Sequence, residues 1–167
     1  MHFILAAAVT LFAAASFADL RWRRIPNALV LAVSAVALVR IGLKFDPIAV
    51  GFDVAAATLL FLLLMVAWAR NLLGAGDVKL AAAAALLVGH EAVLGFLLLT
   101  TLFGGALALL ALADAWMARS MGRSTGFGIP TGPVGVPDLE MARPSVPYGV
   151  AISVAAAITL FVSPPTG

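Results

Sequence analysis

Long apolar stretches constrain the fold of this chain more than any other feature. A helix needs about 20 mostly apolar residues to cross a bilayer, and six apolar stretches follow one another along the chain. They lie near residues 2–18, 28–43, 48–68, 78–89, 92–113 and 147–163. Hydrophobic residues make up 63% of the chain and charged residues 11%, which excludes an ordinary soluble domain. The sequence therefore predicts one all-α domain over residues 1–167, a polytopic membrane bundle of about six transmembrane helices.

The basic residues predict how this bundle is oriented, because short cytosolic loops retain Lys and Arg. If the first loop is cytosolic, only Arg40 and Lys44 of the 10 Lys and Arg lie outside. The cytosolic set is then Arg21, Arg23, Arg24, Arg70, Lys79, Arg119, Arg123 and Arg143. We therefore expect both termini on the non-cytosolic side and a mobile cytosolic loop at about residues 117–146, which is broken by glycine and proline. Since the basic residues mark topology, no nucleic-acid partner is expected.

The first apolar stretch has an alternative interpretation, as a secretory signal cleaved before Asp19. Ser16-Phe17-Ala18 has the small-x-small pattern of a signal-peptidase site. However, no Lys or Arg precedes the stretch and three Arg follow it, which is the reverse of a secretory signal. We favour a first span that is retained.

The acidic residues near the predicted spans are the best functional candidates. An ionised carboxylate inside a membrane costs roughly 2.5–3.5 kcal/mol even on lenient scales, so such residues are usually paired or functional. Asp53, near the outer end of the third span, is expected to form a structural ion pair with Arg40. Asp19, Asp77 and Asp114 instead fall at predicted cytosolic helix ends, where any two of them could meet.

The sequence offers no support for a metal site or a cofactor. The chain contains no cysteine. Neither His2 nor His90 has neighbours typical of a set of metal ligands. We therefore expect no metal site and no cofactor.

Two of the candidate acids lie in short strings with an unusual composition. Asp19 opens Asp-x-Arg-x-x-x-Ile-Pro-Asn, which by itself predicts a charged helix end followed by a helix capped by Asn27. Asp77 closes Gly-x-Gly-Asp, formed with Gly74 and Gly76, which by itself predicts a helix start capped by Asp77. Glycines ahead of an acid also let the backbone approach another chain segment closely. The residues expected to have structural roles are Pro26, Asn27, Arg40 and Asp53.

Together, these two strings resemble those of the type IV prepilin peptidases, which are membrane aspartic proteases with a Gly-x-Gly-Asp motif. A third string, Pro147-Tyr148-Gly149, is similar to the Pro-x-Gly motif that this family carries at the start of its last span. The resemblance covers nearly the whole chain. Without cysteines or a segment before the first span, the chain is similar to the short branch associated with Flp-type, tight-adherence pili, so no N-methyltransferase activity is expected.

The resemblance implies that Asp19 and Asp77 form the catalytic pair of an endopeptidase. In such a pair the ionised carboxylate activates a water and the protonated one donates to the scissile carbonyl. The implied substrate is a prepilin in the lipid bilayer whose short basic leader is removed at the cytosolic face of the bacterial inner membrane. The pilus assembly machinery is a further candidate partner. The residues implied to bind substrate or to shape the site are Gly74, Gly76, Lys79, Pro147, Tyr148 and Gly149.

Two alternatives stay open from the residues alone. A proton-coupled transporter also uses membrane carboxylates, but near the midplane, whereas Asp19 and Asp77 are predicted at one face. A non-catalytic membrane protein of pilus assembly would tolerate conservative changes at both aspartates.

Overall fold

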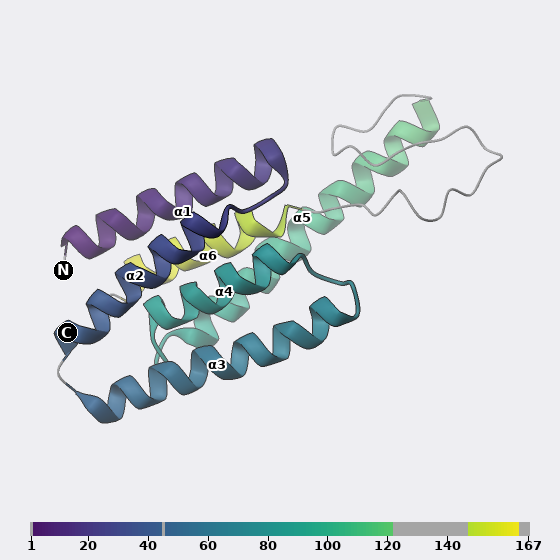
Figure 1. Cartoon of the computed structure of the whole chain (residues 1–167). Helices are drawn as coiled ribbons and strands as arrows, with labels where there is room; N and C mark the ends of the chain where they lie inside the picture. Colours follow the sequence, from purple (N-terminus) through teal and green to yellow (C-terminus); the bar gives the residue numbers. More distant parts are fainter. Residues whose placement is uncertain (1, 45, 122–146, 164–167) are drawn as a thin grey trace.

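A computed structural model of the chain describes residues 2–44, 46–121 and 147–163. Every regular element within these ranges is a helix, which confirms the predicted all-α bundle (Figure 1). The helices are α1 His2–Trp22, α2 Asn27–Lys44, α3 Pro47–Ala69, α4 Ala75–Val88, α5 Val93–Met121 and α6 Tyr148–Val162.

The helices run up and down along a common direction, with α4 in the middle. α4 packs against α2, α3, α5 and α6, whereas α1 packs mainly against α2 and α6. At one end of the bundle α1, α3 and α5 end and α2, α4 and α6 begin, on the right of Figure 1. We call this the site end. α1 and α4 are therefore linked chiefly through α2 and α6.

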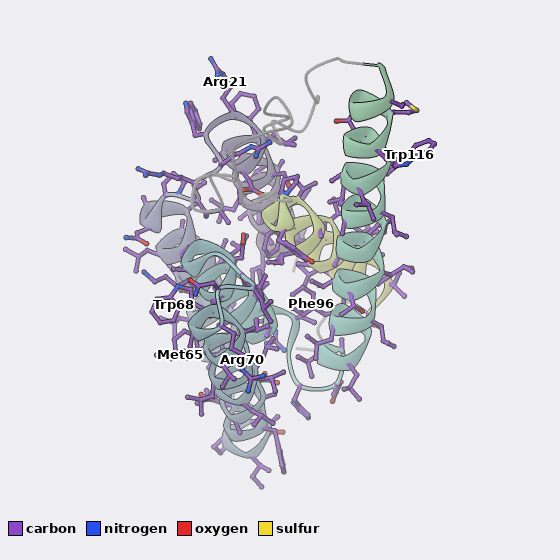
Figure 2. All side chains as sticks on the ribbon, turned by 90° about the vertical axis from the view of Figure 1, so that its right-hand side faces the viewer. Arg21, Met65, Trp68, Arg70, Phe96 and Trp116 are labelled. Atoms are coloured by element: carbon purple, nitrogen blue, oxygen red, sulfur yellow. The ribbon has the colours of Figure 1, made fainter. Side chains whose placement is uncertain are left out.

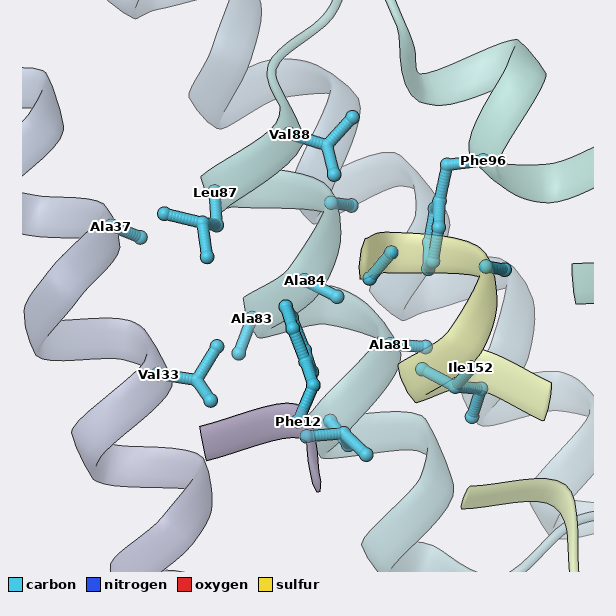
Figure 3. Close-up of a cluster of buried hydrophobic side chains, with 14 of the residues drawn as sticks. Phe12, Val33, Ala37, Ala81, Ala83, Ala84, Leu87, Val88, Phe96 and Ile152 are labelled. Carbon is cyan, nitrogen blue, oxygen red and sulfur yellow. The ribbon is translucent and has the colours of Figure 1, made fainter. Parts of the chain in front are cut away.

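Small side chains on α4 let its neighbours approach closely, as is common where helices pack in membranes. Figure 3 shows Phe12 of α1, Val33 of α2 and Ile152 of α6 grouped around Ala84 of α4, all of them buried. Figure 2 shows Phe96 pointing from α5 into the bundle. Many large apolar side chains stay on the outside, as expected for a chain surrounded by lipid.

The six helices differ in length. Three are long and apolar enough to cross a membrane, over Phe3–Trp22, Pro47–Ala69 and Val93–Asp114, and α2 and α6 contain shorter apolar helices. α4 has only 14 residues, or about 21 Å at the usual rise of about 1.5 Å per residue. The start of this short central helix is partly open, since Gly74 and Ala75 are exposed and Asp77 is half-buried.

Two predicted boundaries were wrong. α1 continues beyond residue 18, so Asp19 lies inside the helix, and the helix ends only where Arg23 adopts a φ of 50°. α5 continues to Met121, because the residues after 117 still include good helix formers. The loop predicted at 117–146 therefore begins later, and its part over 122–146 lies outside the described residues.

Candidate active site

Asp19 lies near the end of α1 and contacts the start of α6. The Asp19 carboxylate accepts hydrogen bonds from the backbone N–H groups of Gly149 and Val150. Pro147, the residue before α6, makes no side-chain cap hydrogen bond. The first N–H groups of a helix have no partner within the helix. The Val150 N–H also donates to the Pro147 carbonyl at 3.2 Å, so the Gly149 N–H has the greater need of an acceptor from elsewhere. Asp19 supplies that acceptor from the other end of the sequence.

Gly149 leaves the space that Asp19 occupies. A Cβ atom at position 149 would lie 2.8 Å from Asp19 Oδ2 and 2.9 Å from Ile25 Cδ1. Nonbonded carbon atoms do not come this close to other heavy atoms. The absence of a side chain therefore allows the backbone of α6 to reach the carboxylate.

Asp77 lies in the first turn of α4, where its carboxylate accepts a hydrogen bond from the Gly74 N–H. Gly74 is the N-cap of α4, and a Cβ there would lie 2.9 Å from Asp77 Oδ2. An acid that reaches back from the third helical position to the N-cap N–H is half of a capping box. The expectation that Asp77 itself is the cap was wrong, because the helix begins earlier, after the extended Gly74.

Ile25 lies between Gly76, which precedes Asp77, and Gly149, which contacts Asp19. Its Cβ lies 3.3 Å from the position of a Cβ at Gly76, and its Cδ1 reaches Gly149 on the other side. Asp77 stands at the polar start of α4, outside the candidate spans. Burial is the main cause that raises the pKa of the Asp77 carboxyl to about 7, and the negative charge of Asp19 is the second cause. Asp19 and Asp77 therefore interact as a pair of carboxylates at the site end.

The pair has the features that acid–base chemistry needs. Asp19 is only 7% exposed, and its Oδ2 atom has no hydrogen-bond partner among the described residues. A carboxylate oxygen that is buried but unengaged can accept a proton from a reactant. A carboxyl group with a pKa near 7 can donate one at neutral pH, as Asp77 would.

A family model described as the type IV leader peptidase family matches residues 6–109. The match covers more than half of the chain and contains Asp19 and Asp77. The chain belongs to the type IV leader peptidase family. This confirms the family predicted from the aspartate strings and makes the chain a leader-peptidase-like protease. No curated protein and no solved structure matches it.

The family match ends before α6, yet residues of α6 complete the surroundings of Asp19. Besides Gly149, which contacts Asp19, Tyr148 packs against α5. A Cβ at Gly104 of α5 would lie 2.8 Å from Tyr148 Cε1. Sequence reasoning missed Gly104, because glycines in an apolar span do not indicate which side chain they contact.

Lys79 and Asn27 lie beside the pair rather than in it. Lys79 is exposed, and its Nζ donates to Asn27 Oδ1 at 3.4 Å. α2 begins at Asn27, so this residue is the first of the helix and not the cap before it. Asp114, the third acid expected at this end, lies within α5 and is partly buried.

A second polar cluster lies at the opposite end of the bundle. The predicted ion pair is present, with Arg40 Nη1 3.2 Å from Asp53 Oδ2 and both side chains buried. His90, which sequence reasoning missed, donates its backbone N–H to Asp53 Oδ1 at 2.8 Å, and its Nδ1 lies 2.6 Å from the same oxygen. The sequence places His90 just after α4, at the predicted depth of Asp53, and this position could have indicated the contact.

Metal ligands do not gather at either cluster. Within the described ranges, no group of three or more His, Cys, Asp or Glu side chains is placed to hold a metal ion. The chemistry that these residues offer is proton transfer by carboxyl groups.

Proposed function

We propose that this chain is a membrane-embedded aspartic endopeptidase that removes the short basic leader of Flp-type prepilins. Asp19 and Asp77 act as its catalytic pair. The observation that carries the proposal is that these two carboxylates, from α1 and α4, lie close enough for the charge of Asp19 to raise the pKa of Asp77, in a chain of the leader peptidase family.

The pair holds one proton between its two carboxyl groups, because like charges this close do not both ionise readily. We assign this proton to Asp77, whose pKa is raised to about 7, and the negative charge to Asp19, which faces the N–H groups of Gly149 and Val150. Asp19 takes a proton from a water whose oxygen bonds to the scissile carbonyl carbon. Asp77 gives its proton to the carbonyl oxygen. When the C–N bond breaks, Asp19 gives its proton to the leaving amine and Asp77 takes a proton back from a hydroxyl of the tetrahedral intermediate, so the pair returns to its starting state.

Tryptophan and arginine side chains support a location at the membrane surface. Trp22, Trp68 and Trp116 lie near the ends of α1, α3 and α5 and are 45–71% exposed. Arg21 lies in the last turn of α1 and Arg70 is the C-cap of α3, so both lie at the site end, as Trp68 and Trp116 do. Tryptophan favours the membrane interface, and Arg favours the cytosolic side. These residues support an active site at the cytosolic face of the inner membrane, with both termini on the other side.

The expected reaction of the wild-type chain is removal of the leader from a co-expressed Flp-type prepilin. The cut follows a glycine at the boundary between the leader and the apolar helix. Mass spectrometry of the processed pilin identifies the bond. A prepilin in which a bulky residue replaces that glycine is the control and stays intact. An intact wild-type prepilin, or a cut elsewhere in the chain, would contradict the proposed substrate.

Cleavage is expected to fall as the pH rises through about 7, because Asp77 then loses the proton that it donates. The folded pKa of Asp77, about 7, lies above its ordinary value of 3.8, so the stability that its protonation contributes is full below pH 3.8 and is lost as the pH rises to about 7. Initial rates from about pH 5 to about pH 9, and thermal unfolding from about pH 3 to about pH 8, check the two effects. Asp77→Asn is expected to remove this part of the stability change. A cleavage rate that stays constant across the range would contradict the role of Asp77.

A further inference from the structure

We propose that the contact between Gly104 and Tyr148 positions the start of α6 on Asp19. Gly104 is therefore a positioning residue for the reaction, although it lies on a helix that carries neither aspartate. This inference rests on the proposed function, because it concerns the geometry of the same carboxylate pair.

The first part of the argument is the closeness of α5 and α6. Gly104 is buried, and a Cβ there would lie 2.8 Å from Tyr148 Cε1 and 3.2 Å from its Cδ1. The aromatic ring therefore lies directly on the backbone of α5. The same Cβ position is 3.9 Å from Ala151, one turn further along α6. α5 thus supports the first turn of α6 at two points.

The second part is the short path from this ring to the carboxylate. Tyr148 is the first residue of α6, and the next two residues, Gly149 and Val150, donate their N–H groups to Asp19. The start of α6 is therefore held between α5, through Tyr148, and α1, through Asp19. Ile25 lies close to position 149 as well, since a Cβ there would be 2.9 Å from Ile25 Cδ1. Moving the ring away from α5 would press α6 onto Asp19 and change the two hydrogen bonds.

The neighbouring glycine provides a matched control. Gly105 is exposed, and a Cβ there would meet no heavy atom within 4 Å. Replacing either glycine by alanine raises the helix propensity of α5 in the same way. The difference between Gly104→Ala and Gly105→Ala therefore isolates the contact with Tyr148.

Gly104→Ala is expected to lower kcat for prepilin cleavage by about 10–100-fold, because small displacements at a reacting centre have effects of this size. Gly105→Ala is expected to stay within about twofold of wild type. The loss should fall on kcat, with KM within about twofold of wild type, since the contact orients Asp19 and not the substrate. A purely structural defect would lower the amount of folded protein and leave kcat per folded molecule unchanged. Equal rates for the two alanine variants would overturn the inference.

Substitutions of Tyr148 test whether the ring carries the effect. An alanine Cβ at position 104 would overlap ring carbons of Tyr148, which phenylalanine keeps. Gly104→Ala should therefore still lower kcat in a Tyr148→Phe background. In a Tyr148→Ala background, where the ring is absent, Gly104→Ala should change kcat by less than about twofold. The same cost in both backgrounds would contradict a role for the ring.

A second readout does not depend on cleavage. Tyr148 is the single tyrosine of the chain, so incorporation of 3-fluorotyrosine gives one ¹⁹F resonance. Asp19→Asn and Gly104→Ala should both shift this resonance, and Gly105→Ala should not. If the shifts occur but the wild type leaves prepilin intact, the proposed function fails and the contact stands. If the wild type cleaves prepilin but the resonance does not respond, only this inference fails.

Discussion

Asp19→Asn and Asp77→Asn are each expected to lower the rate of prepilin cleavage by about 10²–10⁴-fold, the contribution of a positioned general acid or base. Asparagine keeps the shape of aspartate, but its amide can neither take the proton from water nor donate one as a carboxyl group does. The measurement is the initial rate of leader release by each purified variant in detergent or liposomes. Melting temperatures at or above that of the wild type would show that the loss is chemical.

Asp46→Asn is the matched control for these variants. Asp46 caps α3 at the opposite end of the bundle, where its Oδ1 accepts from the N–H groups of Ile48 and Ala49 at 3.0 and 3.1 Å. Asparagine caps helices as well as aspartate does, so the rate should stay within about twofold of wild type. Full processing by Asp19→Asn or Asp77→Asn would contradict the catalytic assignment. If Asp114→Asn alone abolished cleavage, the wrong pair would have been assigned.

Asp53→Asn is expected to destabilise the folded chain by about 3–5 kcal/mol, as when one partner of a buried ion pair is removed. Asp53 is fully buried, and its carboxylate neutralises Arg40, which is only 5% exposed. The variant would leave the Arg40 charge without its carboxylate in the interior. Chemical unfolding in detergent, followed by tryptophan fluorescence, measures the loss.

The double variant Arg40→Gln/Asp53→Asn tests the electrostatic cause. It removes both charges and keeps groups that can hydrogen bond, so it should recover at least half of the lost stability. The cluster lies at the opposite end from Asp19 and Asp77, so the cleavage rate per folded molecule should not change. A single variant as stable as the wild type would contradict the structural role of the ion pair.

The placement of Asp19 and Asp77 at one end of the bundle could be predicted from the sequence, because successive spans alternate in direction. Asp19 follows one apolar stretch and Asp77 precedes another. The predicted spans 28–43 and 48–68 lie between them, so both aspartates are at the same end of the bundle. The Arg40–Asp53 pair follows from the same reasoning, since two opposite charges at one depth in adjacent helices favour pairing.

The packing of α6 could not be predicted in this way. The hydrogen bonds from Gly149 and Val150 to Asp19 join the two ends of the chain, and no local pattern encodes such a contact. The fit of Tyr148 against Gly104 depends on how closely α5 and α6 approach, which is a property of the packed bundle. His90 was missed because its main-chain N–H, and not only its ring, binds Asp53.

The central claim is that Asp19 and Asp77 work as one unit. The most direct test compares the cleavage rate of the double variant Asp19→Asn/Asp77→Asn with those of the two single variants, using quantitative mass spectrometry of the released leader. If the carboxylates share one proton and one water, the loss of either disables the unit, and the double variant should be about as slow as the slower single variant. A double variant whose loss equals the product of the two single losses would show independent contributions and would contradict the claim.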